Sequence, residues 1–218
     1  MGSFDLWLAR RTAGEILFDS EVANLIRRHY PQAMRLTYGS FSSFFSPFRR
    51  SIKNTDCSKR DRIPFLIVFP EKAIPIERQL DRIRFDDQRC VARLKLTSLV
   101  PNLGEELSSL PYLIFDVECG GLTEGMAAEE SASVFESESR SALTVEEGVA
   151  LLTHAPNALR RHNIGCAGHL LDECFVPAFG RCPLSGPILT VFGKKSAKPD
   201  LGFASCGRRL RFGEALKF

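Results

Sequence analysis

The sequence lacks the short motifs that identify the commonest enzyme classes. It contains no G-x-G-x-x-G fingerprint, no Walker A loop, no G-x-S-x-G nucleophile elbow and no H-E-x-x-H helix. It has no C-x-x-C pair, and no apolar run reaches the roughly 18 residues that cross a bilayer. These absences predict a protein with no cofactor and no membrane association, and they leave it without a motif that would mark it as an enzyme.

The chain also lacks a large excess of charge of one sign, since its net charge is only +3. A balance so close to neutral predicts no nucleic-acid partner. No export signal opens the chain, because the run Leu6–Leu8 is too short and Asp5 precedes it. Position 6 is not Ser or Thr, so the myristoylation pattern after Gly2 also fails. The seven cysteines are an odd number, and we expect them to be reduced, without disulfides, in a bacterial cytoplasm.

What the sequence does contain is a mixture of strand and helix patterns. Four stretches read as strands by their apolar content and alternation, namely Ile63–Phe69, Cys90–Leu94, Tyr112–Cys119 and Pro187–Phe192. Four others read as helices, namely Asp19–Tyr30 with its cap at Asp19 or Ser20, Ser40–Phe48, Pro75–Ile83 and Thr144–Arg160. We expect a single α+β domain at residues 18–218, with one mixed central sheet and helices packed on it, after an N-terminal extension at residues 1–17.

The stretch that begins at Thr144 is the clearest local signal. Thr144 and Glu147 form a capping box, and Pro156 divides the stretch into two short helices with an elbow at His154–Pro156. The apolar stripe of the first helix needs a partner surface, and so does one face of the strand Tyr112–Cys119. We therefore expect Val145, Val149 and Leu152 to cover Leu113, Phe115 and Val117. We also expect Gly148 to let the turn at Ala204–Gly207 come close.

One candidate site is a thiol enzyme in the C-terminal half. Cys206 lies in a glycine-containing turn, Arg208 beside it would lower the pKa of the thiol, and His154 or His162 would serve as the base. A second feature is the pair Asp116 and Glu118, which lie two residues apart on one face of a strand. Such a pair can act as acid and base or bind a metal, so Asp116 joins the candidate residues.

A second candidate site is a structural zinc centre in the run H-x3-C-x2-H-x4-C. Its candidate ligands are His162, Cys166, His169 and Cys174. Their spacing matches no established zinc module, which usually pairs two close ligands with two more at a distance. The alternative is that the cysteines are simply buried, as unpaired cysteines commonly are.

The segments L-T-V-E-E-G-V-A-L-L-T-H-A-P (Leu143–Pro156) and G-F-A-S-C-G-R-R (Gly202–Arg209) carry a resemblance. They are similar to a family of small, mainly actinobacterial proteins that is catalogued as a domain of unknown function. This chain departs from the family at Gly168-His169, where many members read roughly G-S-R. The resemblance implies no activity. The leading hypothesis is therefore a non-catalytic binding or interaction protein, whose partner is a protein or a small-molecule ligand.

Overall fold

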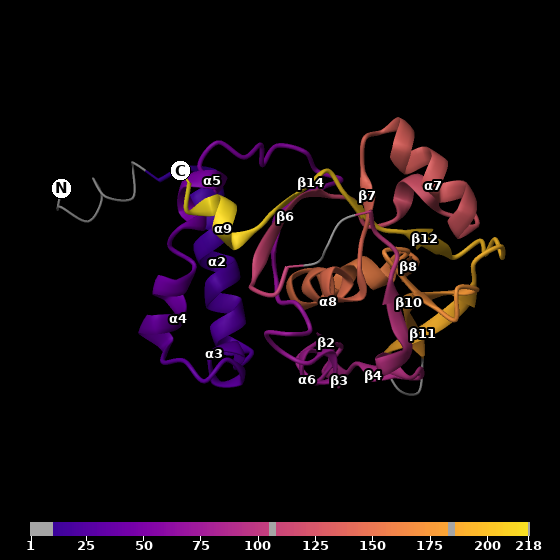
Figure 1. Ribbon diagram of the computed structural model, residues 1–218, viewed down its shortest axis with the longest axis horizontal. Coiled ribbons are helices and arrows are strands. Elements are labelled where there is room, and N and C mark those ends of the chain that lie inside the picture. Colours follow the sequence, from indigo (N-terminus) through magenta and orange to yellow (C-terminus); the bar gives the residue numbers. More distant parts are fainter. Residues whose placement is uncertain (1–10, 105–107, 183–185, 218) are drawn as a thin grey trace.

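The computed structural model describes residues 11–104, 108–182 and 186–217. Its elements form four successive layers, which Figure 1 shows from left to right. A layer of short helices covers a three-stranded sheet, helix α8 (Val145–His154) lies behind that sheet, and a seven-stranded sheet follows. Helix α8 is therefore enclosed between the two sheets.

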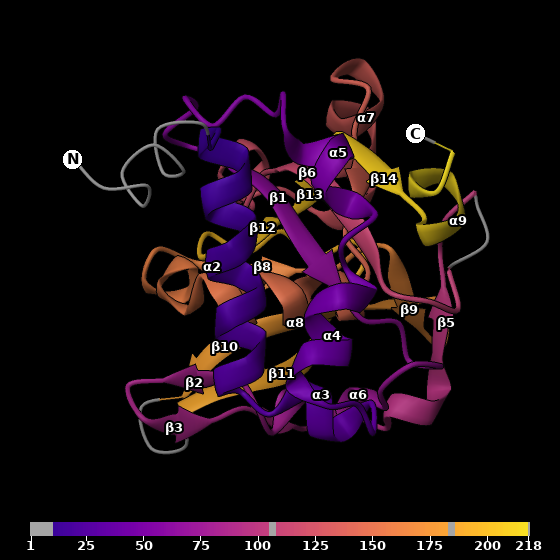
Figure 2. The same ribbon diagram turned by 90° about the vertical axis from the view of Figure 1, so that its left-hand side faces the viewer.

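The helical layer contains the N-terminal part of the chain and its C-terminal helix, which lie side by side in Figures 1 and 2. Its elements are α2 (Ala13–Arg27), α3 (Tyr30–Ala33), α4 (Tyr38–Phe44), α5 (Phe48–Ile52) and α9 (Phe212–Ala215). The cap of α2 is Thr12, in a capping box with Glu15, and not Asp19 or Ser20 as the sequence suggested. Helix α2 thus runs through the expected boundary between residues 17 and 18.

The three-stranded sheet is antiparallel, with β6 (Tyr112–Val117) between β1 (Ile63–Val68) and β14 (Arg208–Leu210). The outer edge of β1 is closed by a buried side chain of α2, because the Ile67 amide donates to the Glu21 carboxyl at 3.1 Å. Burial raises the pKa of Glu21 well above its usual range, and the hydrogen bond from the Ile67 amide opposes that effect. The edge amide of β1 therefore has a hydrogen-bond partner inside the protein.

The larger sheet has the order β12-β8-β10-β11-β4, and β9 pairs with both β10 and β5. Its strands are β4 (Val91–Ala92), β5 (Leu99–Pro101), β8 (Asn163–Gly165), β9 (His169–Leu171), β10 (Phe175–Cys182), β11 (Gly186–Gly193) and β12 (Leu201–Phe203). Two short pairs join β2 (Arg84–Phe85) to β3 (Gln88–Arg89), and β7 (Ser141–Ala142) to β13 (Ser205–Cys206). The remaining helices are α6 (Ile76–Leu80), η1 (Leu96–Ser98), η2 (Gly121–Thr123), α7 (Ala128–Ser137) and η3 (Pro156–Arg160).

The prediction of a single α+β domain is confirmed, but that of one central sheet is wrong. Ile63–Phe69 and Tyr112–Cys119 supply the small sheet, whereas Pro187–Phe192 and the middle of Cys90–Leu94 belong to the large one. The physical reason lies in α8, whose residues from Val145 to Thr153 are all buried. A helix that is buried on every side must contact other elements on every side. A single sheet can cover only one side of a helix.

The expected packing of α8 on β6 is correct for Val117 and wrong for Leu113 and Phe115. Leu113 and Phe115 belong to the N-terminal core, beneath the helical layer, whereas Val117 belongs to the central core around α8. Strand β6 instead presents Tyr112 and Ile114 to the central core. The alternation breaks at Asp116, whose φ of +53° lies in the left-handed region, so Val117 turns to the α8 side.

Gly148 is closely packed, as expected, but its neighbours are not the turn at Ala204–Gly207. A Cβ at this position would lie 2.5 Å from Cys166 Sγ and 2.7 Å from the Phe179 ring, so the large sheet fills the space. Within the turn, Ser205 and Cys206 pair with β7. The expected elbow is confirmed, since α8 ends at His154 and η3 begins at Pro156.

Candidate functional site

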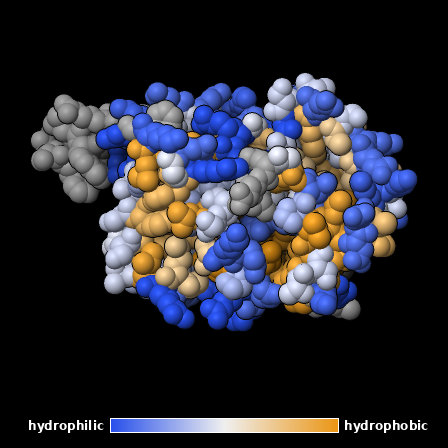
Figure 3. All heavy atoms as spheres, viewed as in Figure 1, coloured by the Kyte–Doolittle hydropathy of each residue, from blue (hydrophilic) through white to orange (hydrophobic). Residues whose placement is uncertain are grey.

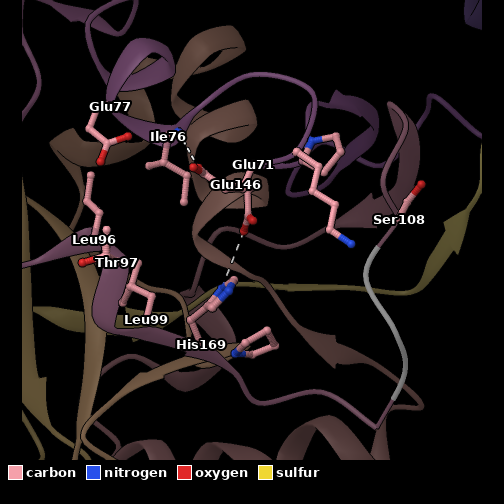
Figure 4. Close-up of a pocket in the computed structure, with 12 residues that line it drawn as sticks. Glu71, Ile76, Glu77, Leu96, Thr97, Leu99, Ser108, Glu146 and His169 are labelled. Atoms are coloured by element: carbon pink, nitrogen blue, oxygen red, sulfur yellow. Dashed lines mark hydrogen bonds and ion pairs between the residues drawn. The ribbon is translucent and has the colours of Figure 1, made fainter.

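A cavity of about 470 Å³ opens beside the N-terminal end of α8. That volume is within the range of small-molecule sites. Five of the lining residues are apolar (Pro70, Ile76, Leu96, Leu99 and Pro101), and the others are polar or charged (Glu71, Lys72, Glu77, Thr97, Ser108, Glu146 and His169). Figure 4 shows the side chains of Glu71, Glu146 and His169 turned toward the same space.

Glu146 is the most unusual residue of this cavity. It is the second residue of α8, it is only 4% exposed, and its Oε2 is buried without a hydrogen-bond donor among the described residues. The helix N-terminus favours a negative charge there, but it does not replace a hydrogen bond. A buried carboxylate oxygen without a donor costs on the order of 1–3 kcal/mol or more. Glu146 Oε2 would therefore be stabilised by a hydrogen-bond donor that the described residues do not supply.

His169 lies next to Glu146 but does not donate a hydrogen bond to it. Its Nδ1 is 3.6 Å from Glu146 Oε2, and it accepts a hydrogen bond from the Val145 amide at 3.1 Å. A ring nitrogen that accepts carries no proton, so the network assigns the proton of the neutral ring to Nε2. Burial lowers the pKa of His169, and the Glu146 and Glu147 carboxylates oppose that effect. The neutral ring leaves the charge of Glu146 uncompensated.

Two more carboxylates lie at the cavity. Glu71 accepts from the Ile76 amide at 2.6 Å, and partial burial raises the pKa of the Glu71 carboxyl. The Ile76 amide lowers that pKa, while the nearby Glu77 and Glu146 carboxylates raise it further. The described lining residues thus comprise three carboxylates and one lysine, Lys72. The electrostatic field in the cavity favours a positively charged guest.

The residues predicted for a thiol enzyme lie on separate elements. Cys206 is fully buried, and its backbone pairs with Ser141, just before the N-terminal end of α8. His154 is the last residue of α8 and contacts Asn24 of α2, with 3.3 Å between His154 Nδ1 and Asn24 Nδ2. At 1.5 Å per residue, α8 alone separates its two ends by about 14 Å. The other predicted base, His162, donates from Nε2 to the Cys119 carbonyl at 3.0 Å.

The structure does bring Asp116 to the C-terminal turn, in an ion-pair network. Its carboxylate accepts from Arg140 at 2.7 Å and from Arg62 at 3.3 Å, and Arg140 also donates to Ser205 Oγ at 2.8 Å. Arg208 lies over the Phe115 ring, with 4.5 Å between its guanidinium carbon and the ring centroid.

The expected pair of Asp116 and Glu118 does not form a joint site. The Glu118 carboxylate instead accepts from the amides of Gly120 and Gly121 at 2.9 and 2.7 Å. These bonds hold the turn that leads into η2. Each of the two carboxylates is thus occupied by its own partners.

The predicted zinc ligands are also apart. His162 and His169 bind backbone groups, Cys166 is buried against Gly148, and Cys174 is exposed. Within the described ranges, no group of three or more His, Cys, Asp or Glu side chains is placed to hold a metal ion. His169 nevertheless belongs to the cavity, so the sequence identified a site residue with a different role.

Sequence reasoning missed Glu71 and Glu146. Glu146 stands beside Glu147 in the same motif, and only Glu147 has a recognisable local role, as the capping residue. Glu147 is occupied by Arg209, which donates from Nε at 2.7 Å, and by Tyr112 at 3.0 Å. The sequence offered one indication of Glu71, which follows Pro70 soon after the end of the buried strand β1. A charged residue where the chain leaves a sheet can line a site.

The comparisons with known proteins give a family and no activity. The search of curated proteins and the search of solved structures each returned no match. In the part of the chain that the structure describes, no helix is long and apolar enough to span a membrane. A model of a family of unknown function, DUF5701, matches residues 24–166, which include Glu71 and Glu146 but not His169. Because this match covers well over half of the 218 residues, the chain belongs to the DUF5701 family.

Proposed function

We propose that this protein binds a small molecule in the cavity beside α8, with Glu146 as the group that holds the ligand. The observation that carries the proposal is the enclosed Glu146 Oε2, which has no donor among the described residues. Buried polar groups in native proteins nearly always have a partner, so an exception at a cavity of ligand size points to a ligand.

The cavity suits binding rather than covalent chemistry. His169 is held by the Val145 amide through Nδ1, so this nitrogen is not available as a base in this arrangement. The described residues that line the cavity include no cysteine and one serine, Ser108, which comes from a loop. This supports the binding hypothesis over the thiol enzyme of Cys206 with His154 or His162.

A small molecule is also better supported than a protein partner. Figure 3 shows hydrophobic residues at the surface over both the N-terminal helices and the large sheet, with hydrophilic residues between them. Among the described residues, the large exposed hydrophobic side chains are spread over separate elements, as with Ile16 on α2, Val100 on β5 and Phe175 on β10. Scattered apolar residues of this kind are normal on protein surfaces. We also place the protein in a reducing bacterial cytoplasm, on the strength of its cysteine content.

The stability of two neighbouring variants tests the role of Glu146. We expect Glu146→Gln to leave the free energy of unfolding within about 0.5 kcal/mol of wild type or to raise it, because it removes a buried charge without a donor. Glu147→Gln should lower it by about 3–5 kcal/mol, because Arg209 then loses its buried partner. Urea unfolding gives both values. An equal loss in the two variants would show that Glu146 is a structural residue.

A binding screen tests the function directly. Differential scanning fluorimetry with small amines, alcohols, amides and carboxylates should find compounds that raise the Tm of wild type and not of Glu146→Gln. Glu129→Gln is the matched control, because Glu129 is the second residue of α7 and stands away from the cavity. If every compound that raises the Tm of wild type also raises that of Glu146→Gln, the proposal is wrong. It is also wrong if no compound raises the Tm of wild type.

A further inference from the structure

We infer that the ligand of this cavity is a small organic cation, an amine with at least one N–H group and an apolar body. The inference rests on the proposed function and specifies the class of ligand. It draws on the charge of the cavity, on the hydrogen-bonding state of Glu146 and on the apolar walls.

The described lining of the cavity carries an excess of acidic groups. Glu71, Glu77 and Glu146 bring three carboxylates to one space, and Lys72 is the single lysine or arginine among the lining residues that the structure describes. His169 adds no charge while its Nδ1 accepts from Val145. An anionic ligand would meet repulsion there, whereas a monocation would restore the balance around Glu146.

Glu146 Oε2 requires a hydrogen-bond donor. A carboxylate accepts hydrogen bonds and donates none, so the ligand must bring an N–H or O–H group. An ammonium N–H bonded to a carboxylate forms a charge-assisted hydrogen bond, roughly twice as strong as a neutral one. The ammonium group is thus the donor that best compensates the burial of this oxygen, which is 3.6 Å from the nearest nitrogen of His169.

The cavity suits an organic cation better than a metal ion. The carboxylates and His169 do not form a metal-holding group, since no such group exists among the described side chains. Much of the wall is apolar, formed by Ile76, Leu96 and Leu99 together with two prolines. An aqueous metal ion gains nothing from such a wall, whereas the body of an alkyl or aryl amine gains from every apolar area that it covers.

Four probes of similar shape test the inference, namely benzylamine, benzyltrimethylammonium, benzyl alcohol and benzoate. Isothermal titration calorimetry at pH 7.5 measures the affinity of each probe for wild type, for Glu146→Gln and for the control Glu129→Gln. We expect benzylamine to bind at least tenfold more tightly than benzyl alcohol, and benzoate not to bind in the cavity. Benzyltrimethylammonium should bind less tightly than benzylamine, because it carries the charge without an N–H for Glu146.

The variants distinguish the inference from the proposed function. Glu146→Gln should lower the affinity for benzylamine at least tenfold. Glu71→Gln should lower this affinity less, because Glu71 already accepts a hydrogen bond from the Ile76 amide. If benzyl alcohol or benzoate binds as tightly as benzylamine and needs Glu146, the protein binds a small molecule but the cation inference is wrong. If none of the four probes shows binding that depends on Glu146, both the inference and the proposed function are overturned.

Discussion

His154 should make the protein lose stability in mildly acidic solution. Asn24 Oδ1 accepts from Arg28 Nε at 3.2 Å, so its Nδ2 is the donor that faces His154 Nδ1. The ring is therefore neutral, with its proton on the enclosed Nε2. A second ring proton would oppose the Asn24 amide. Burial, together with the smaller effect of the Arg28 charge, lowers the pKa of His154 to about 3.

The size of the effect follows from the two pKa values. In the unfolded chain the imidazole has a pKa near 6.5, so below about pH 6.5 the unfolded state binds a proton that the folded state rejects. Stability is therefore lost as the pH falls from about 6.5 toward the folded value of about 3. Between pH 7.5 and pH 5 the loss from this one group amounts to about 2 kcal/mol.

The perturbation is His154→Asn, which keeps an acceptor for Asn24 and removes the titrating ring. The exposed His29 provides the control His29→Asn, because asparagine tolerates its left-handed backbone at φ +61°. Urea unfolding at pH 7.5 and pH 5 gives the pH-dependent change for each protein. We expect His154→Asn to remove about 2 kcal/mol of that change and His29→Asn to leave it intact. The reasoning fails if His154→Asn keeps the full wild-type change.

The packing of Gly148 and the state of the cysteines can be tested by stability, metal content and thiol content. Gly148→Leu should lower the free energy of unfolding by about 1–3 kcal/mol, because Cys166 and Phe179 already fill the space, whereas Gly39→Leu, with no neighbour within 4 Å, should not share the overpacking cost. The purified protein should contain less than about half an equivalent of zinc by elemental analysis; a full equivalent would restore the zinc hypothesis. Thiol titration of the unfolded, unreduced protein should find seven thiols, and five or fewer without an intermolecular dimer would refute the reduced state.

The local part of this fold could be read from the sequence. Capping boxes, proline breaks and apolar strands act over a few residues, so the start of α8, the elbow after it and the strands β1 and β6 were all predicted. The strands β8 to β10 were not, because they contain glycine, cysteine and histidine. Pro177 in β10 also argues against a central strand, since proline cannot donate to a ladder.

The distribution of the strands over two sheets, and the cavity, depend on contacts between distant parts of the chain. Glu146 shows this limit most clearly, since T-V-E-E-G identifies Glu147 as the capping residue but does not indicate what surrounds either carboxylate. One carboxylate is neutralised by Arg209, 62 residues later, and the other lies beside His169, 23 residues later. No local pattern carries that difference.

The position of α8 between two sheets also means that the stretch matched by the family model is not a folding unit. That stretch starts inside α2 and stops at residue 166, just after β8. Expressed alone, it would lack β10 and β11, which form the longest hairpin of the large sheet, and β14, which completes the small one. Phe179 would then be missing from its place against Gly148, and α8 would expose an apolar side to solvent. Deletion studies across this family should therefore keep the C-terminal quarter of the chain, which lies beyond the stretch that the family model matches.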